Sequence, residues 1–150
     1  MPQQVFINLP VADLPRSRDF YSALGFTLNP QFSNDQGACM VLSEHIFVML
    51  LVRSYFQTFT HLPVADPAKA TAVLNALSCD SREQVQAYVD KALAAGGSTP
   101  NPSKDHGFMF QHGFADPDGH QWEVFYMDEA AFAQQADAAD AAGEAGQAGG

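Results

Sequence analysis

Short runs of apolar residues alternate with polar ones in the first third of the chain, on either side of one stretch with helical spacing. In that stretch Asp13 is a typical N-cap, Phe20, Tyr21 and Leu24 share one face, and Gly25 is a typical stop. The flanking runs predict strands over residues 6–11, 26–32, 38–42 and 46–52. Residues 5–52 therefore read as one β-α-β-β-β unit.

The second half repeats this pattern. An apolar run over residues 71–79 predicts a strand, and Ser81 with Gln84 three positions later forms a capping-box sequence. The buried face of the helix that follows is expected to carry Val85, Tyr88, Val89 and Leu93. Further strands are predicted over 98–102, 107–115 and 120–127. Two such units, at 5–52 and 71–128, would pair into one pseudo-symmetric α+β domain.

The segment between the repeats and the C-terminal tail have their own character. Residues 53–70 form a connector with an aromatic cluster and two prolines, long enough to cross the molecule or cover a pocket. Residues 129–150 are rich in Ala, Gly and acidic residues, which predicts a tail that is partly helical or disordered outside the domain at 1–128.

Composition narrows the class of protein. An apolar fraction of 47% over 150 residues is typical of a folded domain. The net charge of −10 disfavours nucleic acid and anionic membranes as partners, although much of it lies in the tail. No signal peptide or membrane span is visible, and Cys39 and Cys79 read as reduced core thiols. A cytoplasmic location is expected.

The stretch from residue 114 to 126 carries the clearest chemistry. Asp116-Pro117-Asp118-Gly119 is a turn sequence, and the apolar residues after it suit a half-buried strand. On that strand Gln121, Glu123 and Phe125 share one face. Because a buried charge is costly, Glu123 either has a partner or marks a site.

These features together resemble the vicinal oxygen chelate superfamily, which includes glyoxalase I, extradiol dioxygenases, and fosfomycin and bleomycin resistance proteins. The resemblance rests on the paired repeats, on Asp19-Phe20-Tyr21 and Leu24-Gly25-Phe26, and on the closing DPDG-x-x-x-E strand. It is closest to uncharacterised bacterial proteins that are similar to lactoylglutathione lyase. It implies cupped sheets that enclose a central cleft, and commonly a homodimer.

Enzymes of that superfamily hold a metal with ligands from the first and fourth strands of each half. Carried over to this chain, those positions are Phe6, Met49, Leu74 and Glu123. Glu123 alone among them can ligate a divalent ion, so no metal or other cofactor is expected, although a divalent metal stays an alternative. Phe6, Met49 and Leu74 would instead line an apolar cleft.

Other residues are candidates for the same cleft. Asn8 shares a strand face with Phe6, and either Gln111 or His112 should point inward, with the choice open. The expected ligand-binding set is Phe6, Asn8, Met49, Leu74, Gln111, His112, Glu123 and Phe125. Glu123 is also the candidate catalytic residue, as a general base. The alternatives are that its carboxylate anchors a ligand, or that it only makes structural hydrogen bonds that remain from an ancestral site. The remaining histidines, at 45, 61, 106 and 120, are expected to be exposed or to bond to turns.

Three functions are compatible with these residues. The leading hypothesis is a protein that binds a small organic molecule in an apolar cleft without the usual metal site, as bleomycin resistance proteins do. The alternative is a metal-dependent glyoxalase-type lyase or isomerase, or a dioxygenase, with an atypical ligand set that uses Glu123. A third possibility is a protein whose pocket has closed and which acts through dimerisation.

Overall fold

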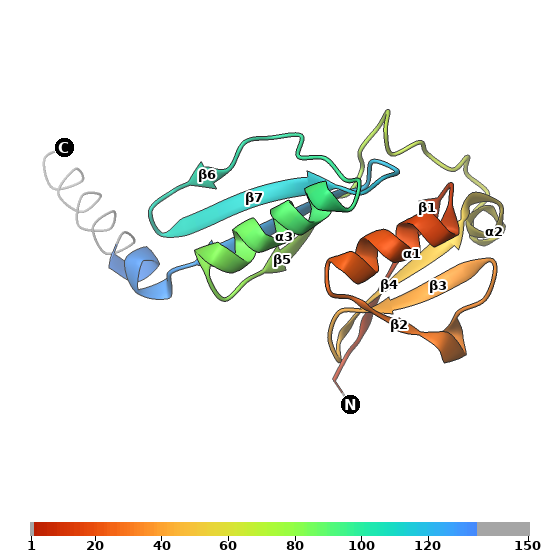
Figure 1. Cartoon of the computed structure of the whole chain (residues 1–150), viewed down its shortest axis with the longest axis horizontal. Coiled ribbons are helices and arrows are strands. Elements are labelled where there is room, and N and C mark those ends of the chain that lie inside the picture. Colours follow the sequence, from red (N-terminus) through yellow and green to blue (C-terminus); the bar gives the residue numbers. More distant parts are fainter. Residues whose placement is uncertain (1, 135–150) are drawn as a thin grey trace, which may run out of the picture.

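The computed structural model describes residues 2–134 and shows two β-α-β-β-β halves side by side (Figure 1). The first sheet has the strand order β1-β4-β3-β2, with β1 and β4 parallel and the other pairs antiparallel. Its elements are β1 (Val5–Val11), α1 (Leu14–Ala23), β2 (Thr27–Asn29), β3 (Gly37–Val41) and β4 (Ile46–Val52). A single turn of 3-10 helix, η1 (Pro30–Phe32), follows β2.

The second sheet has the equivalent order β5-β8-β7-β6, again with one parallel pair, β5 and β8. Its elements are β5 (Asn75–Ser78), α3 (Arg82–Ala94), β6 (Lys104–Asp105), β7 (Met109–Ala115) and β8 (Gln121–Met127). Between the halves the chain forms α2 (Arg53–Phe56), η2 (Gln57–Phe59) and then an irregular segment up to β5. The α+β fold class with two repeats is confirmed.

Helices α1 and α3 lie on the same side of the two sheets (Figure 1). Each begins at its predicted cap: Asp13 accepts a hydrogen bond from the backbone N–H of Arg16, and Ser81 accepts one from that of Gln84. The residues that face the helices form a single core that runs through both halves. The joint is aromatic, because Tyr21 on α1 packs edge-on against Trp122 on β8. The core therefore continues from one half into the other.

Several details of the second half differ from the prediction. Residues 71–74 belong to the connector rather than to a strand, and 98–102 forms an isolated bridge between Ser98 and Ala115 instead of a strand. Prolines at 100 and 102 lack the N–H groups that a ladder needs. Leu93, expected in the core, is 46% exposed, and Ala92 is buried in its place. The Gln84 side chain accepts from the N–H of Asp80 rather than that of Ser81.

The described start of the tail is helical over residues 129–134, where Phe132 packs against Phe108. The rest of the predicted tail, 135–150, lies outside the described residues. Within residues 2–134 no helix has the length and apolar character needed to cross a membrane.

Candidate functional site

The face of each sheet that points away from the helices carries most of the predicted site residues. In β1, Leu9 and Val11 are buried under α1, so Phe6 and Asn8 point to the opposite face. The pairing of β1 with β4 sets Phe6 beside Phe47, with the rings stacked 4.6 Å apart, and Asn8 beside Met49. Phe6, Asn8 and Met49 thus share the open face of the first sheet.

In the second sheet, register decides which polar residues share a face. Trp122 and Val124 are buried on the helix side, so Glu123 lies on the open side, paired with Gly113. Gln111 pairs with Phe125 and therefore lies on the same open face as Glu123. His112 pairs with the buried Val124 and points to the helix side. Of the two residues that the sequence left open, Gln111 is the one beside Glu123.

A cavity of about 450 Å³ lies where the two halves meet, between β1, the connector and the start of β8. We call it the junction cavity. Most of its wall is apolar, and its polar members are Asn8, Thr60, Thr71, Asn75, His120 and Gln121. No Asp, Glu, Lys or Arg is among the described residues that line it. The connector thus covers a pocket, one of the two roles that its length suggested.

A second, smaller pocket of about 40 Å³ lies at Glu123 and Gln111, under the segment 100–102 and beside Lys104. Gln121 lines both pockets. Of the predicted site residues, Asn8 therefore lies in the junction cavity and Gln111 and Glu123 in the smaller pocket. The others line neither pocket: Phe6, Met49, Leu74, His112 and Phe125.

The turn before β8 is held by Asp116. One oxygen of this carboxylate accepts hydrogen bonds from the backbone N–H groups of Asp118, Gly119 and His120, at 2.9–3.0 Å. The other accepts from the hydroxyl of Tyr21 at 2.7 Å. Burial raises the pKa of Asp116, while His120 and the Tyr21 bond act in the opposite direction. The sequence predicts the turn, but nothing in it identifies Tyr21 as a partner of Asp116.

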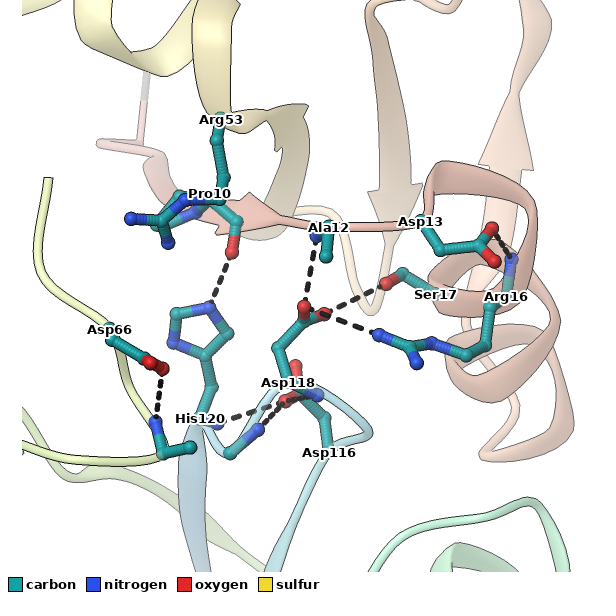
Figure 2. Close-up of polar contacts among 12 residues, drawn as sticks. Pro10, Ala12, Asp13, Arg16, Ser17, Arg53, Asp66, Asp116, Asp118 and His120 are labelled. Atoms are coloured by element: carbon teal, nitrogen blue, oxygen red, sulfur yellow. Dashed lines mark hydrogen bonds and ion pairs between the residues drawn. The ribbon is translucent and has the colours of Figure 1, made fainter.

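Asp118 ties the same turn to the first half of the molecule. Its carboxylate accepts from the N–H of Ala12 at 2.9 Å, from the hydroxyl of Ser17 at 3.2 Å and from the guanidinium of Arg16 at 3.4 Å (Figure 2). Gly119 has φ +106°, and a Cβ there would lie 2.9 Å from backbone atoms of Ala68 in the connector. The turn therefore holds β1, α1 and the connector around one edge of the junction cavity.

His120 follows this turn and lines the junction cavity. Its Nε2 lies 2.7 Å from the carbonyl oxygen of Pro10 in β1 (Figure 2). A carbonyl can only accept, so Nε2 carries the proton and, in the neutral ring, Nδ1 is an acceptor. The sequence predicts an exposed or turn-bonded imidazole at this position, but the His120 ring bonds to a strand in the other half of the molecule and lines a cavity.

The match to a family model decides the family. Residues 3–124 match the model of the Glyoxalase/Bleomycin resistance protein/Dioxygenase superfamily. The chain belongs to this superfamily. The predicted resemblance is confirmed at that level, and one fold of this kind hosts many chemistries.

Several solved structures share the fold. A hypothetical protein from S. aureus has a TM-score of 0.71 at 26% identity, with 84% of this chain and 94% of that one covered. A glyoxalase-related enzyme from Fulvimarina pelagi has a TM-score of 0.71 at 23% identity, with 84% and 88% covered. A glyoxalase/bleomycin resistance protein/dioxygenase family enzyme from Burkholderia phytofirmans has a TM-score of 0.69 at 14% identity, with 84% and 99% covered. A search of the curated proteins finds no match.

The metal positions that the superfamily resemblance implies do not suit a divalent ion in this chain. Phe6, Met49 and Leu74 offer no hard or nitrogen donor, which leaves the single carboxylate of Glu123. Among residues 2–134, no three His, Cys, Asp or Glu side chains are grouped so that they could hold a metal ion. The described donor set does not fit a resident metal.

Proposed function

We propose that the protein binds a small organic molecule with a mostly apolar body in the junction cavity. The observation that carries this proposal is the cavity itself: its volume of about 450 Å³ and a mainly apolar wall with a few polar groups. Ligand sites commonly have volumes of roughly 300–1,000 Å³ and this kind of lining. Burial of apolar ligand surface against this wall would drive binding.

The walls of the cavity are held in place before a ligand arrives. Arg53 donates to the carbonyl oxygens of Val64 and Ala65, at 3.0 and 3.1 Å, which holds the connector against the end of β4. The side-chain amide of Gln121 donates to the hydroxyl of Thr71 at 3.3 Å, which joins the connector to β8. A wall that is already ordered lowers the entropic cost of binding.

The test uses a neutral fluorescent probe, N-phenyl-1-naphthylamine, whose emission rises in apolar surroundings. Ala72 lines the cavity from the connector and is exposed, so Ala72→Trp should fill the cavity with little effect on the fold. Ala94→Trp makes the same change on an exposed position of α3 that does not line the cavity. We expect the native protein and Ala94→Trp to bind the probe and Ala72→Trp to bind it at least about tenfold more weakly. Equal binding by all three proteins would refute the proposal.

We also propose that Glu123 is an anchor for a small hydrogen-bond donor rather than a general base. No described residue makes a hydrogen bond or ion pair to its carboxylate, and the pocket beside it is about 40 Å³, enough for a group the size of water. Gln121 separates this pocket from the junction cavity, so a polar branch of a ligand would reach Glu123 past that side chain.

We propose further that the protein forms a homodimer through the open face of the first sheet. Phe6 stays 49% exposed although it stacks on Phe47, and exposed aromatic residues are enriched in interfaces. Light scattering coupled to size exclusion tests this, with Phe6→Ser expected to shift the mass toward the monomer.

Both cysteines are free thiols, which supports a location in the reducing cytoplasm and can be tested by cell fractionation.

A further inference from the structure

The one histidine in the wall of the junction cavity has its ring orientation and tautomer set by the protein. The backbone N–H of His120 donates to Asp116 at 2.9 Å, and its Nε2–H donates to the carbonyl of Pro10 at 2.7 Å. Backbone and ring are thus each held by a bond, one to the turn and one to β1. In the neutral ring, Nδ1 is left with an unshared electron pair.

Nδ1 is open to the cavity. No residue in the described part of the chain donates to it, and no buried side-chain nitrogen or oxygen in that part lacks a partner, so Nδ1 must be reachable by solvent. In Figure 2 this second ring nitrogen lies on the side of the ring that faces the connector, away from the turn. The connector forms the opposite wall of the junction cavity.

Other polar groups of the cavity wall also offer hydrogen-bond acceptors to a ligand. The side-chain amides of Asn8 and Gln121 each use one N–H, on the carbonyl of Phe6 at 3.2 Å and on Thr71 at 3.3 Å, and both amide oxygens accept no hydrogen bond from a described residue. No described lining residue carries a formal charge. A charged ligand would lose its hydration without gaining a counter-ion, so a neutral ligand is favoured.

We propose that Nδ1 of His120 accepts a hydrogen bond from the ligand of the junction cavity, and that this ligand is a neutral, apolar molecule with a hydroxyl or ring N–H group, as a phenol or an indole has. The inference rests on the proposed function and adds the chemical class of the ligand. Because the acceptor is held from two sides, little conformational entropy is lost when the bond forms.

The experiment compares two probes of nearly the same shape. 2-Naphthol carries a hydroxyl group at the position where 2-methylnaphthalene carries a methyl group. Equilibrium dialysis at neutral pH gives both dissociation constants for the native protein, His120→Phe, His120→Gln and the control His45→Phe. His45 lies in an exposed turn and does not line the cavity. One net hydrogen bond corresponds to a preference of about two- to thirteenfold.

We expect the native protein and His45→Phe to prefer 2-naphthol by that factor, and His120→Phe to bind 2-methylnaphthalene at least as tightly as 2-naphthol, because a buried hydroxyl without a partner is costly. His120→Gln should keep part of the preference, because its amide can both donate to Pro10 and accept from the ligand. The role of His120 is refuted if the native protein binds both probes equally, or if the preference for 2-naphthol survives in His120→Phe. Neither result would refute the binding function. Failure of the native protein to bind either probe refutes the binding function itself.

A second measurement applies even where His120→Phe does not fold. In ¹⁵N-histidine-labelled native protein, the Nδ1 resonance of His120, assigned by its loss in His120→Gln, should have the chemical shift of an unprotonated nitrogen. It should move toward the hydrogen-bonded value on addition of 2-naphthol and not of 2-methylnaphthalene. A protonated Nδ1 in the free protein, or the same response to both probes, refutes the inference.

Discussion

The hydroxyl of Tyr21 makes two buried hydrogen bonds that join the halves of the molecule. It donates to Asp116 at 2.7 Å and accepts from the indole N–H of Trp122 at 3.0 Å, and the Tyr21 and Trp122 side chains are almost fully buried. Tyr21→Phe removes that oxygen and leaves the ring in place. The variant would thus leave a carboxylate and an indole N–H in the core each short of a partner.

The size of the effect follows from these two losses. A hydrogen bond to a charged group contributes about 1.5–3 kcal/mol, and a buried donor left without a partner costs about 1–3 kcal/mol. Because the ring still packs, no cavity larger than a hydroxyl is created. We expect Tyr21→Phe to lower the free energy of unfolding by about 3–5 kcal/mol, and the melting temperature by roughly 10 °C for a domain of this size.

Urea unfolding at 25 °C measures this loss, with the slope of the transition expected to stay unchanged. Tyr55→Phe is the matched control, because the Tyr55 hydroxyl makes no side-chain hydrogen bond in the described residues and Tyr55 lies in the connector. The control should stay within about 0.5 kcal/mol of the native protein. A loss below about 1 kcal/mol in Tyr21→Phe would refute the view that this hydroxyl joins the halves.

Three other predictions concern pH, the turn and Glu123. Burial, followed by the Asp116 carboxylate, raises the pKa of Tyr21 well above its usual value, so above about pH 10 unfolded Tyr21 loses its proton while folded Tyr21 keeps it. Stability should therefore fall as pH rises beyond 10, by up to about 1.4 kcal/mol per pH unit from this group, and urea titrations should show a shallower fall in Tyr21→Phe. Gly119→Ala should cost about 2–4 kcal/mol in the same assay, because φ is +106° and the Cβ would lie 2.9 Å from Ala68, and an unchanged midpoint would contradict this contact. Glu123→Gln should change stability by less than about 0.5 kcal/mol, and a fall in melting temperature of more than about 8 °C would mean that the carboxylate has a structural partner.

The elements that could be predicted are those whose signals are local in the chain. The caps at Asp13 and Ser81, the period of the two long helices and the turn at 116–119 depend on residues within a few positions of each other. The strand alternation that buries Trp122 and Val124 also placed Glu123 on the open face. The family resemblance rests on the same local motifs, which is why the match over residues 3–124 agrees with it.

What could not be predicted depends on register and on contacts between distant segments. The choice between Gln111 and His112 depends on how β7 pairs with β8, which the turn sequence did not settle. Leu74 belongs to the connector because β5 starts one residue later, so its side chain has no strand neighbour and is 53% exposed.

The sequence by itself determined two β-α-β-β-β repeats, their caps and the turn before the last strand, since each of these follows from interactions between near neighbours in the chain. Only the tertiary structure decided which residues meet at the junction. Tyr21 reaches Asp116 across 95 positions, and His120 reaches Pro10 across 110. The junction cavity needs β1, the connector and the start of β8 together, so it is a property of the packing rather than of any single segment.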